Sequence, residues 1–210
     1  MPPVSRAQAW RRDHAAAYLA DIRAYEQISP YLGDDRPVGE VRGVLKPRYF
    51  FRASAGPGWA LIGDAGHHKE FVVGLGISDA LRDARGLAGA IVDGSPGAGE
   101  RWWRRRDAER IEMFHWGREL GNAEPVNALQ RLMISRLAGS PDLHRRFGEI
   151  IDGRRSPYDL VPAADATFWV AGALLRGDTG ALSSFLEVAR RRTKARRDLR
   201  RCRRDIRRSG

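Results

Sequence analysis

The sequence has a single cysteine, Cys202, among its 210 residues. A disulfide framework within one chain is therefore excluded, and nothing in the sequence argues for an oxidising compartment. No apolar run approaches the roughly 20 residues that a membrane-spanning helix needs, and residues 1–10 lack the apolar stretch of a secretory signal. We therefore expect a cytoplasmic protein without a membrane span.

Acidic side chains are too few to balance the basic ones. The chain has 37 lysines and arginines against 26 aspartates and glutamates, which gives a formal net charge of +11. Residues 190–208 hold twelve of the basic side chains and only two acidic ones, Asp198 and Asp205. Because the remainder is close to neutral, the basic charge belongs to a tail and not to the body of the protein.

The arginine-rich tail, residues 190–210, also carries an apolar pattern. Ala195, Leu199, Cys202 and Ile206 recur at steps of three and four residues, which is typical of a narrow helical seam. Three interpretations stay open. The tail is a solvated helix that packs weakly on the body, a helix that binds the phosphates of nucleic acid, or a disordered segment, since arginines at this density repel one another.

Hydrophobic periodicity and turn residues predict a chain that begins with mixed structure and becomes mostly helical. We expect a helix over residues 6–28, short extended runs at 39–45 and 48–53, and a short buried strand at 59–62. Further helices are expected from about 74 to 93, over 101–120, 125–137, 142–151 and 165–175, and from about 182 into the tail.

The helix expected from about residue 74 has an apolar stripe at helical spacing. Its members are Ile77, Ala80, Leu81, Ala84, Leu87, Ala88 and Ile91. Such a stripe normally faces a core, so we expect it to be the buried face of the helix.

The most informative stretch is residues 58–90, in which a strand, a Gly-Asp-Ala-Gly-His turn and a Gly-x-Gly helix start follow one another. This stretch resembles the flavoprotein monooxygenases of the aromatic-hydroxylase type and their wider group, which includes flavin-dependent halogenases and geranylgeranyl reductases. The matching residues are Gly58, Trp59, Ala60, Leu61, Ile62, Gly63, Asp64, Ala65, Gly66, His67, Gly74, Gly76, Ser78, Asp79, Ala80, Asp83 and Ala84.

The resemblance implies the closing part of an FAD-binding domain with the Rossmann fold of glutathione reductase, hence an α/β fold that turns mostly α. Four segments follow. Residues 1–46 would end a substrate-binding region, residues 47–95 would be the C-terminal part of the FAD-binding domain, and residues 96–189 would form a helical C-terminal region before the tail at 190–210.

The turn after the strand predicts a cofactor contact. A carboxylate at the carboxyl edge of a sheet can accept hydrogen bonds from vicinal hydroxyls, and by resemblance Asp64 would hold the ribityl chain of FAD. Gly63 has no Cβ, which lets the backbone approach the cofactor closely. Ala65 completes the predicted contact in the same turn.

The start of the following helix predicts a second contact, made by Gly74, Leu75, Gly76 and Ile77. A helix N-terminus offers unsatisfied N–H groups and the positive end of the helix dipole. By resemblance these groups would meet the pyrimidine edge of the flavin and stabilise negative charge on the reduced ring.

The chain lacks the Gly-x-Gly-x-x-G motif that opens an intact member of this family and seats the FAD pyrophosphate. Gly-x-Gly sequences start at residues 56, 74 and 97, and none has the third glycine. Asp152-Gly153 resembles the family's middle motif but follows the Gly-Asp turn instead of preceding it, so we interpret it as a helix-ending turn. The resemblance thus covers only the last half of a typical member, and an N-terminal-half polypeptide would complete the flavin site.

Two functions are therefore expected. The first is the C-terminal portion of an FAD-dependent oxidoreductase that, with NAD(P)H as co-substrate, acts on a small organic substrate; no catalytic residue is assigned. The alternative is a non-enzymatic binding protein with a degenerate flavin fold, whose tail binds nucleic acid or an acidic partner. No metal site is expected, since adjacent histidines such as His67 and His68 point in different directions on most backbones.

Overall fold

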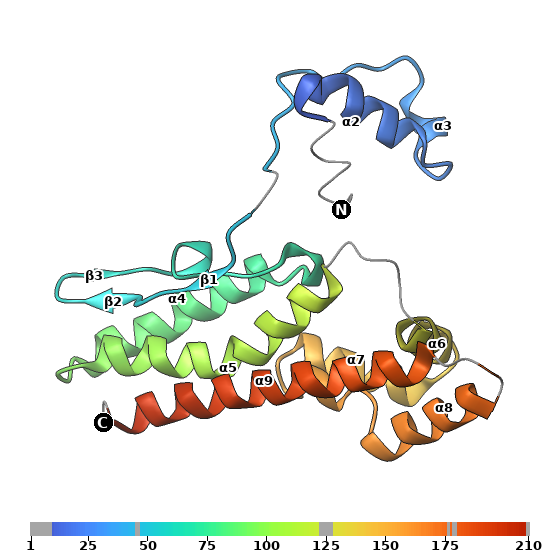
Figure 1. The fold of residues 1–210 in the computed structure, drawn as a ribbon. Helices are drawn as coiled ribbons and strands as arrows, with labels where there is room; N and C mark the ends of the chain where they lie inside the picture. Colours follow the sequence, from blue (N-terminus) through green and yellow to red (C-terminus); the bar gives the residue numbers. More distant parts are fainter. Residues whose placement is uncertain (1–9, 45–46, 122–127, 176, 178–179, 209–210) are drawn as a thin grey trace. The chain divides into compact units, whose positions relative to one another are not determined.

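The computed structural model describes residues 10–44, 47–121, 128–175, 177 and 180–208 (Figure 1). The chain divides into two compact units, Met1–Arg48 and Tyr49–Gly210. The described part is mostly helical and has few, short strands. This agrees with the prediction that the chain becomes mostly helical after a mixed beginning.

The described part of the first unit contains one helix of more than one turn. The 3-10 helix η1 (Trp10–Arg12) precedes α2 (His14–Arg23), and α3 (Ser29–Leu32) follows. Asp13 caps α2, since its Oδ1 accepts a hydrogen bond from the Ala16 N–H at 2.9 Å. The helix expected over residues 6–28 is therefore shorter, residues 6–9 lying outside the described part. Residues 39–44 belong to no strand, so the extended run predicted at 39–45 forms no paired strand over its described part; residue 45 lies outside that part.

The strands of the second unit form two antiparallel pairs. Strand β1 (Phe50–Phe51) pairs with β4 (His67–His68), and β2 (Ala55–Gly56) pairs with β3 (Trp59–Ala60). The 3-10 helices η2 (Gly63–Ala65) and η3 (Phe71–Val73) lie on either side of β4 along the chain. The strand predicted at 59–62 is thus only two residues long. It is exposed, Trp59 retaining 49% of its surface, so the prediction that it is buried is wrong.

Long helices make up the rest of the second unit. They are α4 (Gly76–Asp93), α5 (Ala98–Leu120), α6 (Ala128–Ala138), α7 (Pro141–Ile151), α8 (Ala163–Leu175) and α9 (Gly180–Arg208), with the 3-10 helix η4 (Pro157–Asp159) before α8. The predicted helices are confirmed to within a few residues at each end. Helix α5 lies between α4 and α9 (Figure 1).

Glycines let α4 and α5 form a tight hairpin. Gly94 ends α4 with a φ of 62°, and Gly97 precedes α5 with a φ of 75°, both in the left-handed region that favours glycine. Further along, a Cβ on Gly86 of α4 would lie 2.6 Å from Nε1 of Trp102 on α5. A side chain at position 86 would therefore require Trp102 or its helix to shift.

The hydrophobic core of the second unit lies where α5 meets α7 and the start of α4. Its buried members are Leu75, Met113, Trp116, Ile150 and Leu160. Leu75 directly precedes the first turn of α4, so its burial in the core fixes where that helix begins.

The Ile150→Ala substitution is expected to lower the free energy of unfolding by about 2–5 kcal/mol, because Ile150 is fully buried and its truncation leaves a cavity. The Ile91→Ala substitution is the matched control. Ile91 is 69% exposed, so its truncation should cost much less. Urea unfolding followed by circular dichroism measures both; equal losses would contradict this account of the core.

Candidate functional site

The predicted ribityl-binding turn is the 3-10 helix η2. Gly63 is buried and has a φ of 55°, a conformation that favours glycine. Its N–H donates a hydrogen bond of 2.9 Å to Oδ2 of Asp83 on α4. Asp64 and Ala65 are exposed, and the Asp64 carboxylate has no hydrogen-bond or ion-pair partner among the described residues. The turn is thus held by its first residue and presents the other two to solvent.

The predicted second contact surrounds the start of α4. Gly74 has a φ of 66° and ends η3, and a Cβ on it would meet no atom within 4 Å. Gly76 and Ile77 are exposed at the first turn of α4, whose N–H groups have no acceptor within the helix and no described side chain capping them. The side chain of Leu75, by contrast, is part of the core and leaves only its backbone for a ligand.

The structure brings these two predicted contacts together. A Cβ on Gly63 would lie 3.1 Å from Cβ of Ala80, which is one helical turn after Gly76. The Asp64 turn therefore stands beside the first turns of α4, and both present exposed groups there.

The apolar stripe of α4 is not its buried face, so that prediction is wrong. Ile77, Leu81 and Ile91 keep 81%, 68% and 69% of their surface exposed, and Ala84 and Ala88 are exposed as well. The face packed against the rest of the unit carries two acidic residues, Asp79 and Asp83, which are 2% and 3% exposed. Partners for these carboxylates decided which face of α4 turned inward.

The first of the two carboxylates, Asp83, joins α4 to strand β4, the η2 turn and α5. Its Oδ2 lies 3.0 Å from Nε2 of His67, accepts the Gly63 N–H, and lies 3.6 Å from Nη1 of Arg106. Arg106 in turn donates to Oγ of Ser54 at 2.9 Å. Asp83 therefore holds the predicted cofactor turn in position.

The second carboxylate, Asp79, ties the first turn of α4 to Lys69, which follows β4, and to α5. Its Oδ2 lies 2.9 Å from Nζ of Lys69, and its Oδ1 lies 3.2 Å from Nε of Arg110 on α5. The Lys69 ammonium also donates to Nδ1 of His67 at 2.7 Å. Because His67 contacts both Lys69 and Asp83, the two halves form one continuous buried network.

Burial sets the protonation of the network. It lowers the pKa of His67, whose ring is neutral at pH 7, donates from Nε2 to Asp83 and accepts at Nδ1 from Lys69. Burial also lowers the pKa of Lys69, although the charge of Asp79 opposes that shift. For Asp83, burial alone would raise the pKa, but the hydrogen bonds from His67 and the Gly63 N–H hold it below its usual range.

A third buried carboxylate, Asp107, belongs to the same network. Its Oδ1 accepts from Nη2 of Arg106 at 2.7 Å, and burial raises its pKa to about 6 despite that cation. The network thus joins three carboxylates (Asp79, Asp83 and Asp107) to Lys69, Arg106, Arg110 and the partly exposed Arg82, whose Nη1 lies 3.4 Å from Oδ1 of Asp79. Each carboxylate is engaged, so the network positions the backbone around it and offers no unpaired acid or base.

Sequence reasoning missed this network, although its signal is present. Asp79 and Asp83 are four residues apart on α4, and Arg106 and Arg110 are four residues apart on α5. That spacing places each pair on one face of its helix. Two adjacent helices with matching pairs of opposite charge predict that the charged faces meet.

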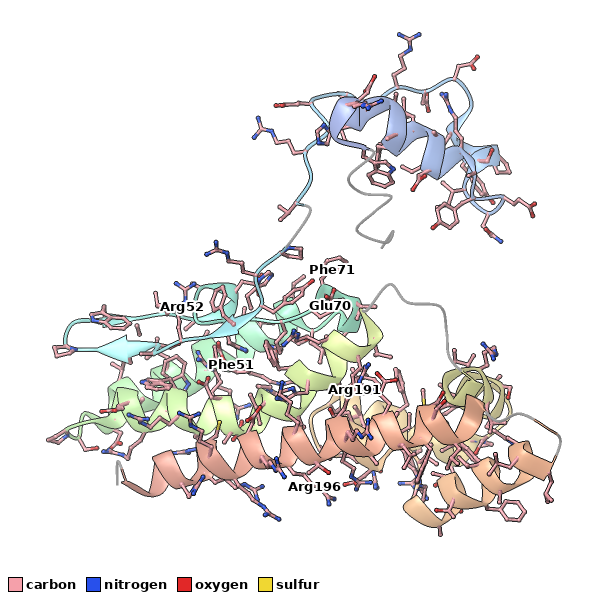
Figure 2. The ribbon with its side chains drawn as sticks, viewed as in Figure 1. Phe51, Arg52, Glu70, Phe71, Arg191 and Arg196 are labelled. Carbon is pink, nitrogen blue, oxygen red and sulfur yellow. The ribbon has the colours of Figure 1, made fainter. Side chains whose placement is uncertain are left out.

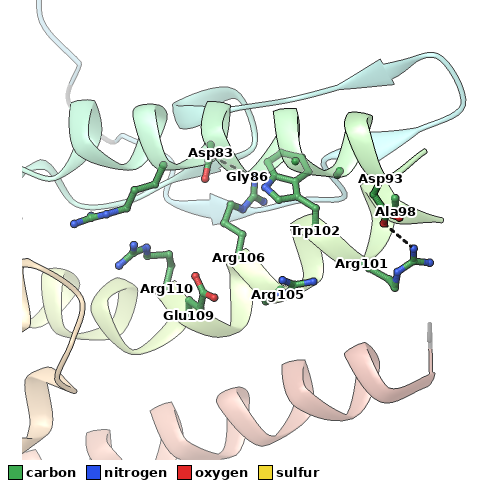
Figure 3. A pocket seen from close by; sticks show the side chains of 13 residues that line it. Asp83, Gly86, Asp93, Ala98, Arg101, Trp102, Arg105, Arg106, Glu109 and Arg110 are labelled. Carbon is green, nitrogen blue, oxygen red and sulfur yellow. Dashed lines mark hydrogen bonds and ion pairs between the residues drawn. The ribbon is translucent and has the colours of Figure 1, made fainter. Parts of the chain in front are cut away.

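A second feature of the unit is a groove of about 390 Å³ between α4 and α5 (Figure 3). Gly86 and Gly89 open it on α4, and Trp102 and Arg105 line it on α5. At one end Arg101 pairs with Asp93, Nη2 to Oδ2 at 3.4 Å. None of the predicted cofactor residues lines this groove, so it is separate from the surface around Asp64.

Comparison with protein families, with curated proteins and with solved structures finds no match to this chain. Among the described residues, no group of histidine, cysteine or acidic side chains could hold a metal ion. The described helices include none long and apolar enough to cross a membrane.

The free energy of unfolding is expected to fall as the pH drops below 6.5, the ordinary pKa of His67, and His67 contributes up to about 1.4 kcal/mol per pH unit to that fall. The unfolded chain takes up a proton there that the buried ring does not, so the stabilisation present above that pH is lost. His115, whose pKa is also lowered by burial, adds to the fall, and Asp107 opposes it below pH 6.

Comparison with the His67→Gln variant isolates the contribution of His67. The variant should be less stable at pH 7 but should lose less stability between pH 6.5 and pH 5 than the wild type does. Identical pH profiles for the wild type and His67→Gln, measured by urea unfolding, would show that His67 is not buried neutral.

Proposed function

We propose that this chain is the C-terminal portion of an FAD-dependent monooxygenase-like oxidoreductase and contributes one wall of its flavin site. A separate N-terminal-half polypeptide, carrying the Gly-x-Gly-x-x-G motif, supplies the rest. The observation that carries this proposal is the apolar stripe of α4, which is exposed beside the exposed groups of the predicted cofactor contact.

The stripe has the properties of an interface. Ile77, Leu81, Ile91 and Val92 are all more than two thirds exposed, and they follow one helix from its first turn to its last. Contiguous apolar patches of this kind mark interaction sites. Burying each large side chain would contribute about 1.5–3 kcal/mol, which favours a partner that covers the whole length of α4.

The residues around Asp64 fit the polar parts of FAD. The unpartnered Asp64 carboxylate can accept hydrogen bonds from ribityl hydroxyls. The uncapped N–H groups at the start of α4 can donate to the pyrimidine edge, and the helix dipole there favours negative charge on the reduced ring. The open space at Gly74 leaves room for a ring to approach.

When bound, FAD would supply the redox chemistry, taking electrons from NAD(P)H for oxidation of a small organic substrate. The role of this chain is to bind and orient the cofactor. Asp83 supports that role indirectly. It accepts the hydrogen bond from the Gly63 N–H and thereby fixes the direction of the Asp64 turn. The buried carboxylates are engaged in the network, and we assign none of them to proton transfer.

The proposal is tested by purifying the tagged chain from its own source under mild conditions. We expect flavin, detected by its visible absorbance after release, and a co-purifying polypeptide whose sequence contains Gly-x-Gly-x-x-G after a strand. FAD titrated into the isolated chain should bind weakly or not at all. Purified chain with neither flavin nor such a polypeptide would contradict the proposal.

Two variants locate the interface and the contact. Leu81→Glu should abolish co-purification, because it places a charge in the middle of the stripe; Leu175→Glu, at an exposed leucine of α8, is the matched control. Asp64→Asn should weaken FAD binding by the complex about tenfold or more, the value of a charge-assisted hydrogen bond. Asp165→Asn on α8 should leave FAD binding unchanged.

A further inference from the structure

Helix α9 holds the basic tail as a fixed ridge along the second unit. Ala195 is fully buried and Ser184 nearly so, on the face turned toward the body. Nε2 of His115 on α5 lies 2.8 Å from Oδ2 of Asp198, and Nη2 of Arg192 donates to Oδ1 of Asp159 at 2.7 Å. The backbone that carries the arginines is therefore ordered before any ligand binds.

Most described cations of this ridge have no described partner. Arg191 pairs with Glu187 and Arg192 with Asp159. Eight other exposed side chains have neither a hydrogen bond nor an ion pair among the described residues, namely Arg190, Lys194, Arg196, Arg197, Arg200, Arg201, Arg203 and Arg204. Figure 2 shows Arg196 among the side chains that extend from α9 into solvent.

Seven of these eight cations fall into two rows. Arg190, Lys194, Arg197 and Arg201 follow one flank of the exposed face at helical steps of three and four residues, and Arg196, Arg200 and Arg203 follow the other. The longer row spans about 16 Å, since a helix rises about 1.5 Å per residue. Phosphates of one DNA strand are spaced about 3.4 Å apart along the helix axis, so this row can face about five of them.

We infer that the outward face of α9 binds double-stranded DNA through its phosphates, independently of sequence. The major groove of B-form DNA is about 12 Å wide and admits an α-helix, and a helix lying there has a phosphate strand on each flank, where α9 has a row of cations. The major groove of duplex RNA is too deep and narrow for this arrangement. This inference does not depend on the proposed flavin site.

Charge and apolar surface together favour nucleic acid over a lipid surface. A helix that lies in a membrane interface turns its apolar face to the lipid. In the basic part of α9 the small and apolar side chains Ala195, Leu199 and Cys202 lie on the inward flank and are buried or partly buried. The face left outside is polar and cationic, as a phosphate backbone requires.

The experiment measures binding of the full chain to a fluorescent DNA duplex of about 20 base pairs by anisotropy, over a series of salt concentrations. If six to eight cations meet phosphates, log Kobs against log salt should have a slope of about −5 to −7. A variant with Arg196, Arg197, Arg200 and Arg201 changed to glutamine should lose about half of that slope. Circular dichroism should show it folded, since none of the four pairs with another side chain that the structure describes.

The matched control removes four arginines that are ion-paired elsewhere, Arg42, Arg104, Arg145 and Arg154, also by change to glutamine. It lowers the net charge equally and should keep the wild-type slope. An equal loss of slope in both variants would overturn the inference, because net charge alone would then explain binding. Tighter binding to a duplex RNA of the same length, or to vesicles of anionic lipid, would overturn it as well.

Discussion

The buried ion network between α4, α5 and the segment around β4 is the constraint on which the second unit depends. A buried charge is costly unless it is paired and hydrogen-bonded, so α4 must turn Asp79 and Asp83 toward Lys69, His67, Arg106 and Arg110. That single requirement sets the rotation of α4 about its axis. The apolar stripe, on the other side of the helix, is left facing outward.

The same constraint shapes the candidate cofactor surface. Asp83 fixes Gly63 through its backbone N–H, and Leu75 anchors the start of α4 in the core. Asp64 and the free N–H groups of the first helical turn are then exposed on neighbouring segments. On the proposed function these exposed groups form one wall of a flavin site, and another polypeptide would supply the rest. Helix α9 lies on the other side of α5, and the DNA-binding inference for its cations does not depend on this surface.

Helices were predicted from sequence because local signals define them. Ser140 and Pro141 at the start of α7 and Gly94 after α4 are cap and stop residues whose effects act within one turn. The strand at 59–62 was predicted with less success. A run of four apolar residues between turns does not determine whether another strand or a core covers it. Here neither covers Trp59, which stays half exposed.

The sequence by itself determined where the helices lie, that the basic charge gathers in the tail, and that the Gly-Asp turn precedes a helix with a bare N-terminus. Only the tertiary structure decided which face of α4 is buried. Apolar periodicity favoured one face, and the pairs Asp79/Asp83 and Arg106/Arg110 favoured the other. Pairing energy depends on Lys69, which follows β4, and on Arg106 and Arg110 of α5. These residues lie outside α4, so no window of α4 alone contains the information that chose between the two faces.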